Sequence, residues 1–126
     1  MKGFINGAIL LIIILFSCRT SDNCGNRNAV ETFNKHVRAI EKHKAGQAID
    51  GKVYFSLFFL ETVTNANSSA SYGDISYYEN QDSIDNDIVR WRNWLQENKC
   101  DLNLDSLKKI EKHIKETNPW MGMETD

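Results

Sequence analysis

The side chains best suited to chemistry in this sequence are its cysteines and histidines, three of each. Cys100 and His113 would supply a thiol nucleophile and a base if the fold joined them, but their spacing matches no family signature. His36 and His43 are seven residues apart, which on a helix separates them by about 10 Å, too far for one metal ion. Without a CxxC pair or an HExxH sequence, we predict no metal site and no cofactor, and we expect surface histidines.

Three aspartates, Asp82, Asp85 and Asp87, stand close together in the second half of the chain. Closely spaced carboxylates suit calcium, but an EF-hand loop needs a glycine at its sixth position and a glutamate at its twelfth. Counted from the first aspartate, those positions hold Asp87 and Asn93. The cluster fits better in the first turns of a helix, where the helix dipole favours negative charge.

The first residues of the chain have the pattern of a secretory signal peptide. Residues 8–16 are all apolar and follow a single charge, at Lys2. The stretch is too short for a membrane-spanning helix, which needs about 20 apolar residues. Its ending, Leu-Phe-Ser at residues 15–17 followed by Cys18, resembles the lipobox of bacterial lipoproteins. The resemblance implies a signal peptide over residues 1–17 and lipidation of Cys18.

The polar residues 18–28 that follow are predicted to form a flexible tether. If Cys18 carries lipid, Cys24 and Cys100 are the two remaining cysteines. An even number in an oxidising compartment favours a disulfide. This bond would close a loop of about 77 residues and stabilise the fold by at most roughly 4.5 kcal/mol. The alternative is two free thiols, one in the tether and one at a helix end.

Residues 29–126 have the pattern of one small folded domain. The whole chain has 126 residues, of which 41% are hydrophobic and 25% charged, and this leaves room for no more than one domain. Apolar residues recur at helical spacing in three segments: residues 29–45, a helix that starts at Asp82 or Ser83, and a last segment that ends before Pro119. We predict a mainly α fold with about four short helices and one long loop.

The fourth expected helix falls in residues 52–64, which are apolar almost throughout. Their β-branched and aromatic residues favour a buried strand, whereas Ser56 and the sequence after it are typical of a helix start. We favour the helix. Residues 65–80, rich in Asn, Ser, Ala and Gly, are predicted to form the long loop, and loops of this length are often functional or mobile.

Aromatic residues supply the candidate binding surface. Trp91 shares a helical stripe with aliphatic residues, so we expect it in the core. Tyr77 and Tyr78 lie in the predicted loop, and Trp94 borders the apolar stripe. Because aromatic side chains are enriched in binding surfaces, these three residues are predicted to form one.

Residues 87–99, DIVRWRNWLQENK, resemble a pattern, DxxxWxxWxxxNK, that recurs in small uncharacterised bacterial lipoproteins of the Bacteroidota type. Upstream, residues 59–64 are similar to a short Leu-Glu-x-x-Thr helix that accompanies the pattern. A glycine often follows that helix, and here Asn65 takes its place. The resemblance covers about residues 54–104 and implies a related fold and an envelope location, but no activity and no site residue.

The charge balance excludes one class of partner. With 15 basic and 17 acidic residues, the chain lacks the positive field that nucleic acid binding needs. We therefore predict a lipoprotein of the bacterial cell envelope, anchored in the membrane and facing the periplasm or the exterior. Its domain is expected to be a non-catalytic binding or interaction module, which binds a protein or another envelope component through residues 65–80 and neighbouring aromatic side chains. The alternative is a small envelope hydrolase, because catalytic residues assemble from distant positions without a sequence motif.

Overall fold

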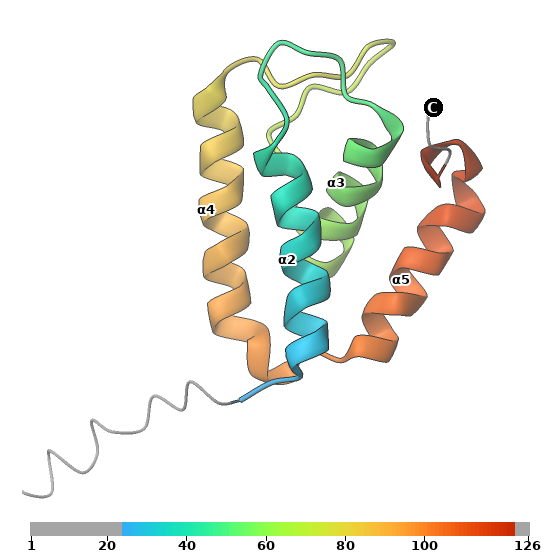
Figure 1. The fold of residues 1–126 in the computed structure, drawn as a ribbon. Helices are drawn as coiled ribbons and strands as arrows, with labels where there is room; N and C mark the ends of the chain where they lie inside the picture. The colour runs from blue at the N-terminus through green and yellow to red at the C-terminus, as the bar shows by residue number, and fades with distance from the viewer. Residues whose placement is uncertain (1–23, 123–126) are drawn as a thin grey trace, which may run out of the picture.

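The computed structural model describes residues 24–122. The predicted signal peptide, the lipidation site Cys18 and the start of the predicted tether lie outside the described residues. The described chain forms α2 (Arg27–Glu41), α3 (Gly51–Thr64), α4 (Gln81–Asn98) and α5 (Leu104–Thr117), with the short 3-10 helices η1 (Lys99–Asp101) and η2 (Pro119–Gly122) (Figure 1). The mainly α single domain is confirmed, and residues 52–64 are helical. None of these helices has the length and apolar character needed to cross a membrane.

Each α-helix begins directly after an Asn or Asp whose side chain accepts a hydrogen bond from the first turn. These capping residues are Asn26, Asp50, Asn80 and Asn103. Such side chains satisfy backbone N–H groups that have no partner within the helix. The caps of α2, α3 and α4 precede the expected starts of these helices, so the three helices begin earlier than predicted.

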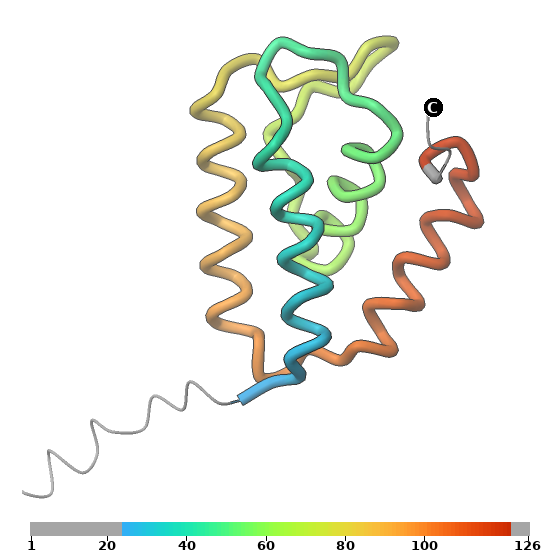
Figure 2. The backbone as a smooth tube through the Cα atoms, in the orientation of Figure 1, coloured from blue at the N-terminus to red at the C-terminus, as the bar shows by residue number. Residues whose placement is uncertain are grey.

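The order of the helices explains why the chain contains a long connection. α2 lies at the centre and packs against α3, α4 and α5. α3 and α4 run in the same direction, opposite to α2 and α5 (Figure 2). Residues 65–80, which join α3 to α4, must therefore return along the length of the bundle.

This returning segment is fixed by backbone hydrogen bonds to the α2–α3 connection. The N–H of Ile49 donates to the carbonyl of Ser76, and the N–H of Gly46 donates to the carbonyl of Tyr78, both at 2.8 Å. Ser71 and Tyr77 exchange two further backbone bonds at 2.9 and 3.1 Å. Residues 65–80 thus lack regular secondary structure but are tied to the bundle.

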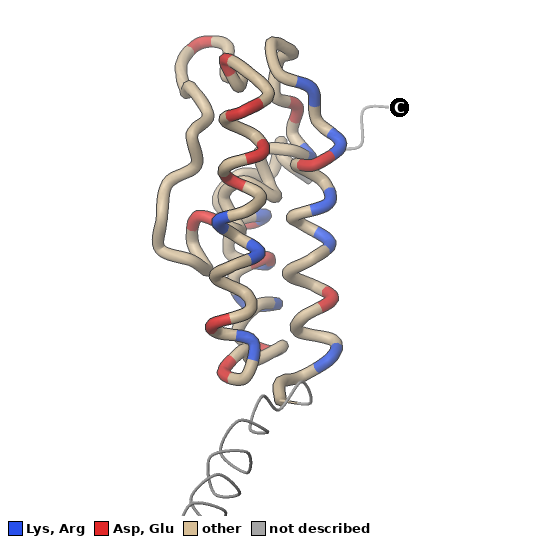
Figure 3. Tube along the Cα trace, turned by 90° about the vertical axis from the view of Figure 1, so that its left-hand side faces the viewer, with Lys and Arg blue, Asp and Glu red and all other residues tan. Residues whose placement is uncertain are grey.

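Charge is unevenly distributed along α4. Asp82, Asp85 and Asp87 lie in its first half, and Arg90 and Arg92 follow them toward its other end (Figure 3). Asp82 falls in the first turn, as the helix-dipole argument predicted.

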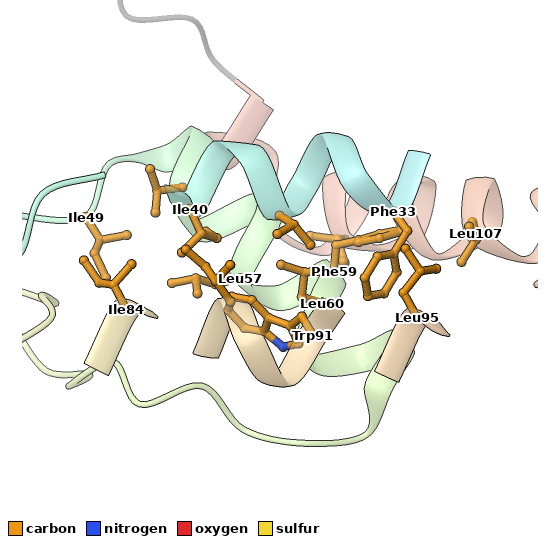
Figure 4. Close-up of a cluster of buried hydrophobic side chains, with 14 of the residues drawn as sticks. Phe33, Ile40, Ile49, Leu57, Phe59, Leu60, Ile84, Trp91, Leu95 and Leu107 are labelled. Atoms are coloured by element: carbon orange, nitrogen blue, oxygen red, sulfur yellow. The ribbon is translucent and has the colours of Figure 1, made fainter. Parts of the chain in front are cut away.

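The hydrophobic core lies between α2 and the helices that pack against it (Figure 4). Trp91 is completely buried there, which confirms its prediction as a core residue. Its indole N–H has no hydrogen-bond partner among residues 24–122, and an unsatisfied buried donor of this kind costs about 1–3 kcal/mol. Other completely buried side chains include Phe33, Ile40, Leu57, Phe59, Leu60 and Ile84.

A disulfide between Cys24 and Cys100 joins the start of α2 to η1, with the two Cα atoms 4.9 Å apart. At Gly25 the backbone has a φ of 103°, and a side chain there would collide with the carbonyl of Lys99. Residues 24–28 are therefore part of the folded domain. The predicted tether boundary at residue 28 is wrong, because the disulfide and the first turn of α2 fix these residues.

Candidate functional site

The aspartate of the DxxxWxxWxxxNK pattern lies at the centre of a buried polar network. Asp87 is 1% exposed and accepts hydrogen bonds from the Ser69 N–H at 2.7 Å and the Ser69 hydroxyl at 2.8 Å. The Tyr78 hydroxyl and the Arg90 guanidinium also donate to it, at 2.8 and 2.9 Å. Arg90 donates further to the carbonyl of Asn67, at 2.7 Å. The network fastens residues 65–80 to α4.

Tyr78 belongs to this network and not to the molecular surface. Its side chain is completely buried. Burial and the hydrogen bond to the Asp87 carboxylate raise the pKa of Tyr78 well above its usual range, so the phenol stays protonated. The prediction that Tyr78 forms part of an exposed binding surface is wrong, because its hydroxyl is needed to satisfy a buried carboxylate.

The other two residues of the predicted surface lie apart from each other. Trp94 is partly buried and stacks on Phe33, with ring centroids 5.3 Å apart. Tyr77 is 38% exposed and pairs through its backbone with Ala48, beside the start of α4. Trp94 lies about 20 Å further along α4 at the 1.5 Å rise of a helix. Tyr77, Tyr78 and Trp94 therefore do not form one surface.

A different group of aromatic rings does gather on an outer face, and we call it the aromatic surface: Tyr54, Phe58, Tyr72 and Trp120. Tyr54 is its centre, with its ring centroid 5.8 Å from Phe58, 6.1 Å from Tyr72 and 5.2 Å from Trp120. Phe58 and Tyr72 are 6.2 Å apart. Tyr72 and Trp120 are 47% and 50% exposed, whereas Tyr54 and Phe58 are partly buried.

Three separate parts of the chain position these rings. Tyr54 and Phe58 are four residues apart on α3, so they lie on one side of the helix. Tyr72 comes from residues 65–80, and its hydroxyl donates to Glu61 Oε1 at 2.5 Å and lies 3.0 Å from the Ser68 hydroxyl.

Trp120 comes from η2, where its neighbour Met121 is 2% exposed and holds the turn against the bundle. The close approach of η2 to α3 depends on Gly51, because a side chain there would meet the Trp120 carbonyl at 3.2 Å. The aromatic surface thus depends on the packing of distant segments.

Sequence reasoning missed the aromatic surface because it joins residues far apart in the chain. The four-residue spacing of Tyr54 and Phe58 places them on one side of a helix, but α3 is apolar on nearly all sides, so the pattern does not show which side faces outward. Burial and the bond to Glu61 raise the pKa of Tyr72 above its usual range, so this hydroxyl also remains a donor.

A second buried network joins α2, α3 and α5. The His36 Nε2 donates to Glu111 Oε1 at 2.7 Å, and its Nδ1 lies 2.9 Å from the Ser56 hydroxyl, which we assign as the donor to a neutral ring. The imidazole also stacks on Phe59, with centroids 3.9 Å apart. His36 is 1% exposed, so its prediction as a surface histidine is wrong. Burial lowers the pKa of His36, although Glu111 acts in the opposite direction.

Serine, histidine and a carboxylate are the residue types of a hydrolase triad. Here Ser56 is 4% exposed and lies in the middle of α3, where the neighbouring backbone N–H groups are used within the helix. A substrate cannot reach a hydroxyl that is buried in this way. The network therefore holds three helices together. The other possible nucleophile, Cys100, is in the disulfide, and His113 is exposed on α5.

The resemblance pattern consists of residues that build the fold. Asp87 anchors the returning segment, Trp91 fills the core and Trp94 stacks on α2, while the Asn98 side chain donates to the Trp94 carbonyl at 2.8 Å. Asn65, which directly follows α3, has a φ of 52°. Glycine and asparagine are the residues that tolerate this left-handed conformation.

Within residues 24–122, no group of three or more His, Cys, Asp or Glu side chains is arranged to hold a metal ion. No family model matches the chain, and neither the curated proteins nor the solved structures contain a significant match to it.

Proposed function

We propose that this protein is a lipid-anchored component of the bacterial cell envelope that binds a partner protein through the aromatic surface and catalyses no reaction. The observation that carries the proposal is the convergence of four rings from α3, residues 65–80 and η2 on one outer face. Aromatic side chains dominate the binding energy of protein interfaces. Rings already held by one another lose little freedom when a partner binds.

The surroundings of Tyr72 fit the margin of such an interface. Glu61 accepts hydrogen bonds from the Tyr72 hydroxyl and from both the N–H and the hydroxyl of Ser68, the last two at 3.2 and 2.6 Å. A polar cluster thus borders the exposed rings. Protein interfaces commonly have this arrangement, with an apolar centre and a polar rim.

The proposed anchor also gives the aromatic surface a direction. Cys18 precedes Cys24 by six residues, which span at most about 20 Å when fully extended. The Cys24 end of the bundle therefore stays near the membrane. The start of α3 and the end of α5, which bring Tyr54 and Trp120 together, lie at the opposite end (Figure 2). A partner would meet the aromatic surface on the side away from the membrane.

Trp120→Ala tests this function, with Val89→Ala as the matched control, because these side chains are 50% and 57% exposed and lie on different elements. Both variants should keep the thermal midpoint within a few degrees, as expected for exposed positions. We expect Trp120→Ala to lose a partner protein that wild type and Val89→Ala both capture from intact envelopes. Equal capture by all three proteins would contradict the proposal.

A further inference from the structure

A concave region that shares no residue with the aromatic surface lies between α2 and α4, next to the disulfide. It is a cleft of about 570 Å³, a volume within the usual range for small-molecule sites. Val30 and Leu95 supply its apolar lining, and Cys24 and Gly25 border it. Its polar lining consists of Arg27, Asn34, Arg92, Asn93, Gln96 and Lys99.

The polar side chains that line the cleft are either positively charged or carboxamides. Three cations and three carboxamides line the cleft and no carboxylate does, although the whole chain has a net charge of −2. Arg92 donates to Glu41 at 2.9 Å, but both side chains are about half exposed, and an ion pair of this kind is weak. Among residues 24–122, Arg27 and Lys99 take part in no ion pair. The cleft therefore offers N–H donors and positive charge, and among residues 24–122 only Arg92 of its three cations is paired with a carboxylate.

We propose that this cleft binds a phosphate group, either as the headgroup of an anionic phospholipid or as a free phosphate. Phosphate oxygens accept several hydrogen bonds at once, which matches a site built from guanidinium, ammonium and carboxamide donors. The short chain between Cys18 and Cys24 would keep the cleft within reach of headgroups, and this one step depends on the proposed anchor.

The test uses the mature protein with its disulfide intact, in an uncharged detergent at constant ionic strength. The protein is titrated with inorganic phosphate and, separately, with dihexanoylphosphatidylglycerol, while NMR follows the side-chain NH₂ signals of Asn34, Asn93 and Gln96. Because detergent replaces the membrane, the result does not depend on partner binding at the aromatic surface. The variant carries Arg27→Gln and Lys99→Gln, and a matched control carries Lys108→Gln and Lys109→Gln on α5.

We expect saturable shifts of these signals, with affinity about tenfold lower or worse in the cleft variant and unchanged in the control. Shifts with both ligands, or with phosphate alone, identify a site for the phosphate group itself. Shifts with the lipid alone identify a headgroup site. The absence of shifts with either ligand, or equal affinity in the cleft variant and the control, overturns the proposal.

Discussion

Asp87→Ala should be among the most damaging single substitutions in this protein. The carboxylate is 1% exposed and accepts four hydrogen bonds, two from Ser69 and one each from Tyr78 and Arg90. Bonds to charged groups contribute about 1.5–3 kcal/mol each, but four that share one acceptor are not additive. Arg90 is half exposed and regains water when the carboxylate is removed, but the Tyr78 hydroxyl and both Ser69 donors lose their acceptor. Because each unsatisfied buried donor costs about 1–3 kcal/mol, we expect a loss of about 3 kcal/mol or more.

The loss is measurable because domains of this size unfold with about 5–15 kcal/mol. For a domain of 60–100 residues, each kcal/mol lowers the thermal midpoint by about 4–8 °C, so Asp87→Ala should lower it by about 12 °C or more. Circular dichroism during heating measures this midpoint. Limited proteolysis should also show earlier cleavage within residues 65–80, since that segment loses its attachment to α4.

Asp85→Ala is the matched control, because Asp85 is exposed on the same helix and, among residues 24–122, accepts a side-chain hydrogen bond from Gln81 alone, at 3.1 Å. Its effect should stay within about 0.5 kcal/mol. If Asp87→Ala is no more destabilising than Asp85→Ala, the network does not fasten the returning segment and the reasoning is refuted.

Three further predictions concern His36 and the cysteines. Burial lowers the pKa of His36 in the folded protein, so as the pH falls His36 is protonated in the unfolded chain before it is protonated in the folded one. The free energy of unfolding should therefore keep its full value above about pH 6.5 and decrease below it by at most about 1.4 kcal/mol per pH unit. Urea unfolding between pH 7.5 and 5 should show this slope, and His36→Gln should remove most of it. Reduction of the Cys24–Cys100 disulfide, which closes residues 76 apart, should lower the urea midpoint without abolishing the helical circular dichroism spectrum, whereas mass mapping that finds both thiols free in native protein would contradict the bond. Mass spectrometry of the mature N-terminus should find a lipid on Cys18, and an unmodified Cys18 would contradict the anchor.

Local patterns predicted the elements of this fold well. The apolar stripe that contains Trp91 placed α4 and part of the core correctly, because a 3.6-residue period depends only on neighbours in sequence. The boundaries shifted where two caps competed, as at Asn80, which caps α4 in place of Asp82 or Ser83. Asn, Asp and Ser are all good N-cap residues, and the sequence alone does not show which of them caps the helix.

The sites were harder to predict because they depend on long-range contacts. His36 is hydrogen-bonded to Glu111, which lies 75 positions later in the chain, and this bond offsets the cost of burying the imidazole. Tyr78 can be buried because Asp87, on α4, accepts a hydrogen bond from its hydroxyl. The aromatic surface likewise forms only because η2 packs against α3. The spacing of apolar residues in the sequence does not predict such a contact.

The most direct test of the proposed function is site-specific photo-crosslinking in intact cells. A photoreactive amino acid replaces Trp120 in one strain and Val89 in another, two exposed positions on different elements. We predict that the Trp120 position forms a covalent adduct with one discrete envelope protein and that the Val89 position does not. If neither position gives a discrete adduct, or both give the same one, the aromatic surface is not the binding face of this protein.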